Sequence, residues 1–350
     1  MKRLGIIAQD INSGIGVQTQ EYARWLKPNK VLITDLTSFH EAAGKNVKRY
    51  PERFSKFDTR VTEGVPNLQD LEWLLKDIDV ILIVETPINH NLYSMARERG
   101  VKTCLAYNYE LLDKLHSEHA HLPMADELWA PTMWHYLEMQ QKAKEWGCKW
   151  RYMPVPVNRE LLPFKPSSKA RVFLHIAGHP TFMDRNGTDI VLTAIPLVKN
   201  KNVQFLIRSQ RELPEIDDPR VVLIRGEVRN YYEAHSRGDV LLLPRRYGGL
   251  TLQLNEALSR GMVPIMPDIS PQNGFLREEW LVPAHFHSKA VTRPEIDVYD
   301  IGPLDLAKKI DHYSGLSDFT FSHWSLAADK IAQDLDWEYL LPLYREALDE

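Results

Sequence analysis

The stretch LLLPRRYGGLTLQLNEALSRGMVPIMPD, from Leu241 to Asp268, says more about the fold than any other segment of the chain. An apolar strand leads into two arginines, a tyrosine and a Gly-Gly pair. A helical segment follows, carries a single acid, Glu256, and stops at Arg260-Gly261 before a second apolar strand. Its apolar positions i, i+4, i+7 and i+8 form one buried stripe, and they are Leu250, Leu254, Ala257 and Leu258. This pattern predicts a strand–helix–strand unit of a parallel sheet.

The same alternation of short apolar runs and helical patterns extends over most of the chain. The runs lack polar alternation, which is typical of parallel strands covered on both faces. They lie at 3–8, 30–36, 79–85, 101–107, 127–132, 171–178, 203–209, 220–226, 238–244 and 262–268. A proline-rich segment, 151–171, interrupts the rhythm and reads as a connector. We therefore expect two doubly wound α/β domains, 1–163 and 164–315, and a helical segment, 316–350, that packs back toward the first domain.

Composition excludes several classes of protein. The 350 residues carry a net charge of −4, which gives no bulk attraction to nucleic acid. The two cysteines, Cys104 and Cys148, make a disulfide scaffold unexpected and fit a reducing compartment. The sequence contains no run of about 18 apolar residues, so we expect no membrane span. The basic start, MKRLGIIAQD, is too short and too polar in its apolar part for a signal peptide. We expect a cytoplasmic protein.

The glycine pair and the acid of the opening stretch predict a nucleotide site. The first N–H groups of a helix lack internal partners and carry positive partial charge, and Gly248 and Gly249 let a phosphate approach them closely. Glu256 follows Gly249 by seven residues, about 10 Å along a helix, so it lies within reach of the ribose of a bound nucleoside diphosphate. Arg245 and Arg246 add positive charge to the same loop. The alternative is a plain tight turn with a solvated Glu256.

The run from Tyr247 to Ala257, followed by Arg260-Gly-Met-Val-Pro264, resembles the donor-binding motif of retaining GT-B glycosyltransferases. The order of strands, the stretch VPVNRELLPF and the terminal helical segment are also similar to that family. The resemblance implies two facing Rossmann-like domains, with the nucleotide sugar held mainly by the second and the acceptor by the first. It also implies sugar transfer with retention of anomeric configuration, generally without a metal.

The sequence departs from the motif at several positions. The family's first glutamate is replaced by Gly248, which leaves the identity of the sugar open. In the loop from Ala177 to Gly187, His179 stands at the family's arginine and Asn186 at its lysine, while Arg185 keeps a cation in reach. The predicted donor-binding residues are Glu256, Gly248, Gly249, Leu250, Arg185, His179, Arg208 and Arg245. The sequence does not rank the four arginines Arg185, Arg208, Arg245 and Arg246.

In the first domain, polar groups follow the expected strands. Gly14 and Gly16 form a glycine loop after the first strand, which resembles the family's loop near the donor phosphate or the acceptor; a simple strand–helix turn is the alternative. Glu85, Asn108 and Glu110 lie at or just after two further strands and are the candidate catalytic residues. Asn108 stands where the family often has a histidine. A cleft-lining structural role is the alternative for each of the three.

We expect no metal and no cofactor beyond the nucleotide sugar as co-substrate. His116, His119 and His121 lack the cysteines or the regular helical spacing of a metal site. The basic and aromatic residues of 142–152 suit a helix end better than a nucleic-acid surface. The leading hypothesis is a hexosyl- or pentosyltransferase that uses a nucleoside diphosphate sugar. The alternatives are a GT-B sugar-nucleotide epimerase and a non-catalytic nucleotide-sugar binding protein, and the acceptor is open: a protein, a glycan, a small molecule or a modified DNA base.

Overall fold

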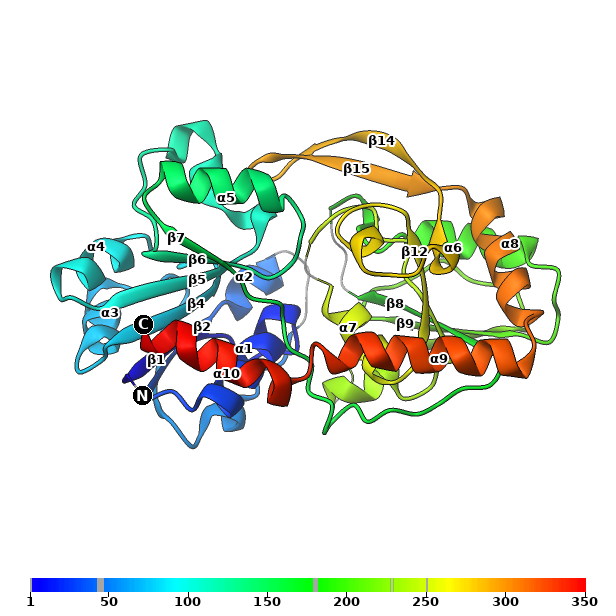
Figure 1. The fold of residues 1–350 in the computed structure, drawn as a ribbon, viewed down its shortest axis with the longest axis horizontal. Helices are drawn as coiled ribbons and strands as arrows, with labels where there is room; N and C mark the ends of the chain where they lie inside the picture. Colours follow the sequence, from blue (N-terminus) through cyan, green and yellow to red (C-terminus); the bar gives the residue numbers. More distant parts are fainter. Residues whose placement is uncertain (1, 43–46, 179–181, 227, 229, 250) are drawn as a thin grey trace. The chain divides into compact units, whose positions relative to one another are not determined.

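The computed structural model describes residues 2–42, 47–178, 182–226, 228, 230–249 and 251–350. The chain divides into two compact units. Unit 1 comprises Met1–Val155, Val291–Pro294 and Leu340–Glu350, and unit 2 comprises Pro156–Ala290 and Glu295–Tyr339. Each unit contains one main sheet flanked by helices (Figure 1).

Unit 1 is built on a seven-stranded parallel sheet with the order β3-β2-β1-β4-β5-β6-β7. Its strands are β1 (Leu4–Ala8), β2 (Lys30–Asp35), β3 (Asp58–Glu63), β4 (Val80–Glu85), β5 (Lys102–Tyr107), β6 (Glu127–Ala130) and β7 (Lys149–Tyr152). Its helices are α1 (Gly14–Leu26), α2 (Thr37–Ala42), α3 (Leu68–Leu75), α4 (Asn91–Glu98), α5 (Tyr136–Glu145) and α10 (Trp337–Asp349), which belongs to unit 1 from Leu340 onward. The central strands are buried along almost their whole length, as their unbroken apolar runs predict.

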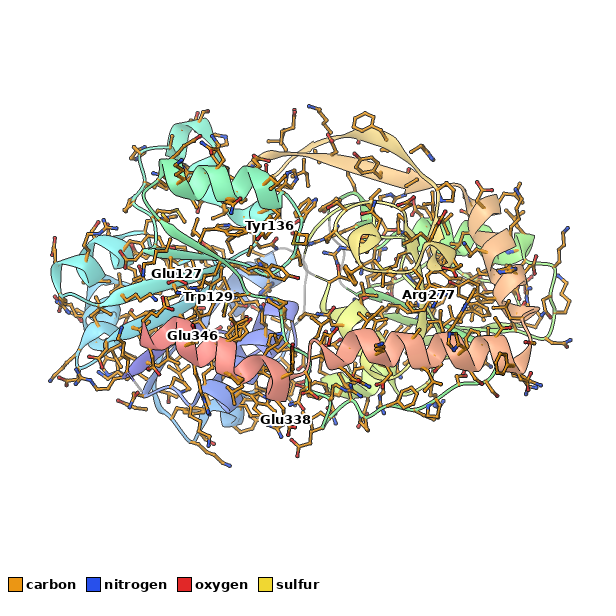
Figure 2. All side chains as sticks on the ribbon, in the orientation of Figure 1. Glu127, Trp129, Tyr136, Arg277, Glu338 and Glu346 are labelled. Atoms are coloured by element: carbon orange, nitrogen blue, oxygen red, sulfur yellow. The ribbon has the colours of Figure 1, made fainter. Side chains whose placement is uncertain are left out.

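The C-terminal helix α10 closes the core of unit 1. Tyr344 is fully buried and packs edge-on against Trp129, with ring centroids 5.4 Å apart. Its hydroxyl lies 3.2 Å from the hydroxyl of Tyr22 on α1. Trp129 and the buried Glu127 both come from β6 (Figure 2). The Glu127 carboxylate accepts hydrogen bonds from Trp129 Nε1 at 3.0 Å and pairs with Lys102 Nζ at 2.8 Å, which offsets the cost of burying its charge.

Unit 2 is built on a six-stranded parallel sheet with the order β10-β9-β8-β11-β12-β13. Its strands are β8 (Val172–Gly178), β9 (Gln204–Ser209), β10 (Val221–Arg225), β11 (Val240–Leu242), β12 (Val263–Pro267) and β13 (Leu281–Val282), and β14 (Ala284–Val291) and β15 (Glu295–Ile301) form a separate two-stranded sheet. Its helices are α6 (Thr188–Ala194), α7 (Leu252–Ser259), α8 (Pro303–Ser314) and α9 (Asp318–Gln333).

The expected fold class is confirmed: two Rossmann-like units with parallel sheets are followed by C-terminal helices. In both sheets the strand order reverses between the first and the fourth strand, at β1/β4 and at β8/β11. Loops at the carboxyl ends of strands beside such a reversal are where open α/β sheets bind ligands. From the topology we therefore expect ligands at the loops after β8 and β11 in unit 2 and after β1 and β4 in unit 1.

Candidate functional site

In unit 2 the loops after β8 and β11 lie next to each other because these two strands are paired. The register joins Val240 to Phe173 and Leu241 to Leu174. Beyond the strands, the backbone N–H of Arg246 donates to the carbonyl of Arg185 at 2.9 Å. The two segments in which the sequence predicts diphosphate contacts are thus brought together.

Two guanidinium groups converge on Gly248. This glycine is buried and has a φ of +106°, and a Cβ atom added to it would lie 2.3 Å from Arg185 Nη2 and 2.7 Å from Arg245 Nη2. Arg185 lies over the ring of Tyr247, 5.1 Å from its centroid, and Arg245 Nε donates to the carbonyl of Tyr247 at 2.9 Å. The space that a side chain at position 248 would occupy is therefore taken by two cationic groups. This gives a physical reason for the glycine at the place where the resembling motif has a glutamate.

The helix α7 begins directly after this loop. Its N-cap, Thr251, makes no side-chain capping bond, and no acidic residue lies in its first turn. Its first N–H groups add positive partial charge to the two guanidinium groups. Gly249 is buried in the same loop. Leu250, also predicted to bind the nucleotide, lies outside the described residues.

Glu256 is buried on α7, so the alternative of a solvated acid is wrong. Its Oε2 atom lies 3.6 Å from Nδ1 of His235, which is also buried. Burial, and then Arg260 and Arg208, lower the pKa of His235 to about 3, so the imidazole is neutral at physiological pH. Burial, and then the Glu256 carboxylate, raise the pKa of Tyr231, which keeps that phenol protonated. The acid thus lies among a neutral imidazole and a phenol.

Sequence reasoning missed His235 and Tyr231. Both belong to the short 3-10 helix Tyr231–His235, which follows β10 and contacts α7. The available signal was a cluster of aromatic side chains, NYYEAH, shortly after an expected strand. Arg208, at the end of β9, lies in the same region: its Nη2 donates to the carbonyl of Glu233 at 3.2 Å, and burial lowers its pKa.

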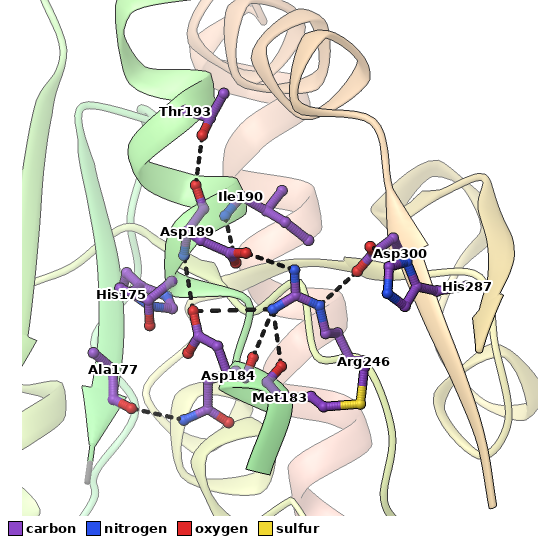
Figure 3. A network of polar contacts seen from close by, with 12 residues as sticks. His175, Ala177, Met183, Asp184, Asp189, Ile190, Thr193, Arg246, His287 and Asp300 are labelled. Atoms are coloured by element: carbon purple, nitrogen blue, oxygen red, sulfur yellow. Dashed lines mark hydrogen bonds and ion pairs between the residues drawn. The ribbon is translucent and has the colours of Figure 1, made fainter. Parts of the chain in front are cut away.

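Arg246, the neighbour of Arg245, has a structural role (Figure 3). Its buried guanidinium group pairs with Asp189 at 2.8 Å and with Asp300 at 2.5 Å. Its Nη1 also donates to the carbonyls of Met183 and Asp184, at 3.1 and 3.0 Å. These contacts join the start of α6, the loop after β8 and β15, and they engage Arg246 within the fold. Of the four arginines, Arg185 and Arg245 are the two that meet at Gly248.

The loop after β8 contains two further predicted positions. Asn186 Nδ2 donates to the carbonyls of Ile176 and Ala177, at 3.2 and 3.3 Å. The residue that replaces the family's lysine therefore stabilises the end of β8. His179 lies outside the described residues.

In unit 1 the three candidate catalytic residues lie at or just after the carboxyl ends of two neighbouring strands. Glu85 ends β4 opposite Tyr107, the last residue of β5, and it has a φ of +64°, a conformation that is costly for a residue with a side chain. Asn108 and Glu110 follow β5, both are buried, and Asn108 Nδ2 donates to Glu110 Oε1 at 3.3 Å. The arrangement gathers polar groups at the carboxyl ends of β4 and β5, and a role in proton transfer stays a prediction for each of them.

The glycine loop of unit 1 has a packing explanation. A Cβ atom at Gly16 would lie 2.0 Å from the carbonyl oxygen of Ile11, so a side chain is excluded there. The N–H of Gly16 donates to Ser13 Oγ, the N-cap of α1, at 3.1 Å. Gly14 is the first residue of that helix. These contacts agree with the alternative of a simple strand–helix turn. A contact of this loop with the donor or the acceptor stays a prediction.

Within the ranges that the structure describes, no group of three or more His, Cys, Asp or Glu side chains is placed to hold a metal ion. No described helix is long and apolar enough to cross a membrane. Both cysteines are free.

No protein-family model and no curated protein matches this sequence. Solved structures do match its fold. HepE from Anabaena, in complex with UDP, is 12% identical, covers 100% of both chains and superposes with a TM-score of 0.68. Sucrose-phosphate synthase from Thermosynechococcus elongatus is 14% identical over 99% of both chains, with a TM-score of 0.63. A glycosyltransferase from Rickettsia africae is 10% identical over 99% of this chain and 98% of that one, with a TM-score of 0.66. The fold is therefore that of GT-B glycosyltransferase structures.

Proposed function

We propose that the protein is a glycosyltransferase that moves a hexosyl group from a nucleoside diphosphate sugar to an acceptor hydroxyl, with retention of configuration. The observation that carries the proposal is the meeting of Arg185 and Arg245 at Gly248, directly before the helix that presents the buried Glu256. Two fixed cations and a helix start favour a diphosphate, and in this proposal the carboxylate about two turns further on accepts hydrogen bonds from the ribose. HepE has been solved with UDP and with UDP-glucose, which makes UDP-glucose the first donor to test.

The proposed chemistry depends on positioning and on charge. In this proposal Arg185, Arg245 and the first N–H groups of α7 stabilise the negative charge that develops on the leaving diphosphate, without a metal. The donor-side arrangement alone does not favour an epimerase, which needs ionisable groups around the sugar. The resemblance of the motif supports retention, and the two free thiols support a reducing, cytoplasmic location.

A thermal-shift screen tests the proposal. A ligand that binds only the native state raises the melting temperature, so UDP-glucose, other nucleotide sugars and the free nucleotides are compared on one scale. We expect a nucleoside diphosphate sugar, with uridine or another base, to raise the melting temperature of the wild type. The rise should be smaller in Glu256→Gln. Transfer and hydrolysis assays with and without EDTA then separate an enzyme from a non-catalytic binding protein. Stabilisation by no nucleotide sugar would refute the proposal.

A further inference from the structure

A second polar and aromatic cluster lies in unit 1, after β5 and β6. It consists of Tyr109, Trp134, His135 and Glu138. The rings of Tyr109 and His135 are stacked, with centroids 3.8 Å apart and an interplanar angle of 6°. Trp134 lies 5.4 Å from the first ring and 4.9 Å from the second, at 66° and 60°, so it stands beside the stack and not on top of it.

Glu138, on the first turn of α5, fixes both stacked rings. Its Oε1 atom accepts a hydrogen bond from the Tyr109 hydroxyl at 2.9 Å, and its Oε2 atom lies 2.9 Å from Nδ1 of His135. Burial, and then Glu138 itself, raise the pKa of Tyr109, which keeps the phenol protonated as the donor. Because a carboxylate only accepts, Nδ1 of His135 carries a proton in this contact, and Nε2 is the ring atom left to meet a ligand.

The second ring nitrogen of His135 has no partner among the residues that the structure describes, and the side chain is 30% exposed. The backbone of His135 has a φ of +52°, which costs free energy for a residue with a side chain and is retained only when its surroundings hold it. Here the stack and the Glu138 contact hold it. The result is a ring nitrogen in a fixed orientation, next to a half-buried indole, at the carboxyl ends of two neighbouring strands of an open α/β sheet.

We propose that Trp134, His135 and Glu138 form a binding subsite for a neutral saccharide, in which a sugar hydroxyl forms a hydrogen bond with His135 Nε2 and the sugar ring packs against Trp134. Aromatic walls with a few fixed polar groups are what small-molecule sites use to bind and orient a ligand. The cluster contains one carboxylate, that of Glu138, and neither a lysine nor an arginine, which disfavours a phosphorylated sugar. The inference rests on the proposed function, because it takes the saccharide to be the acceptor.

The test is saturation-transfer NMR on the full chain, with and without saturating UDP. The probes are methyl α-glucoside, methyl α-mannoside, methyl α-galactoside, maltose and glucose 6-phosphate. His135→Gly removes the ring and suits the left-handed backbone, so it spares the fold. Glu138→Gln keeps the shape and removes the charge that orients the ring. Glu145→Gln, on the same helix and paired with Lys142, is the matched control.

We expect at least one neutral saccharide to bind the wild type, with an affinity about tenfold lower in His135→Gly, because one hydrogen bond of this kind is lost. A smaller loss is expected in Glu138→Gln and no change in Glu145→Gln. The subsite is refuted if no neutral saccharide binds, if His135→Gly binds as the wild type does, or if glucose 6-phosphate binds better than the neutral sugars. UDP affinity, measured on the same variants by calorimetry, should be unchanged. If UDP does not bind to the wild type, that result counts against the donor site, and the saccharide result still stands.

Discussion

In unit 2, Nδ1 of His235 lies 3.6 Å from Oε2 of Glu256, and both side chains are buried. The pKa of His235 is lowered to about 3, so the imidazole brings no positive charge to this pair at neutral pH. The contact consequently does not neutralise Glu256 as an ion pair would. A carboxylate in such surroundings is suited to accept hydrogen bonds from ligand hydroxyls, which is the role that the proposed function gives it.

Replacement of Glu256 by Gln should lower the affinity for UDP about 10- to 100-fold, because hydrogen bonds to a charged acceptor are lost. Isothermal titration calorimetry measures the change. The exposed Glu215, also in unit 2, gives the control Glu215→Gln, which should bind UDP as the wild type does. Equal affinities in the two variants would remove the ribose role from Glu256.

Gly248→Ala should destabilise the protein by about 1–3 kcal/mol, since a side chain at a φ of +106° is strained, and it should weaken UDP binding by displacing Arg185 and Arg245. Urea unfolding and calorimetry measure the two effects. The control is Gly274→Ala, where an added Cβ atom meets nothing within 4 Å. A Gly248→Ala protein as stable as this control would contradict the crowding at position 248.

Substitution of Arg246 should mainly lower stability, whereas substitution of Arg185 should mainly weaken UDP binding. Arg246→Met leaves Asp300 and the more exposed Asp189 without their cation and should cost about 1–3 kcal/mol of unfolding free energy. Arg185→Met should lower UDP affinity about tenfold or more, with a much smaller effect on stability. Both variants are compared by urea unfolding and by UDP titration. The same profile in both would mean that Arg246 does not have the structural role assigned to it.

Much of the fold follows from the sequence, because the central strands are unbroken apolar runs that only a sheet covered on both faces can bury. The strands that the sequence did not predict differ from these central strands in their burial. β3 reads DTRVTE and β7 reads KWRY; both lie at sheet edges and carry exposed polar residues. β14 is largely exposed and β15 has buried residues between polar ones, so their sequences, AHFHSKAV and EIDVYDI, carry no apolar run.

The donor site was predicted only in part, for a different reason. Glycines and an acid at helical spacing identify a helix start and its neighbour, and Glu256 and Gly248 were found in this way. Which of two adjacent arginines faces the site depends on partners far away in the sequence, such as Asp300 for Arg246. The roles of His235 and His135 depend in the same way on tertiary contacts, which the periodicity of the sequence does not predict.

The lowered pKa of His235 predicts how stability varies with pH. In the unfolded chain a histidine has a pKa of about 6.5, whereas in the folded protein that of His235 is about 3. Below pH 6.5 the unfolded state therefore binds a proton that the folded state does not, and the free energy of unfolding falls as the pH falls. Between pH 7 and pH 5 this contribution amounts to about 2 kcal/mol.

His235→Gln should remove that part of the pH dependence. Urea unfolding at pH 7 and at pH 5 gives the loss of stability for each protein, and the wild type should lose about 2 kcal/mol more than the variant. The control is His323→Gln, which removes an exposed imidazole from the same unit. Comparing each protein with itself at the two pH values cancels any direct effect of the substitution on packing. If His235→Gln loses as much stability as the wild type, His235 must become protonated in the folded protein, and the neutral neighbour assigned to Glu256 would be wrong.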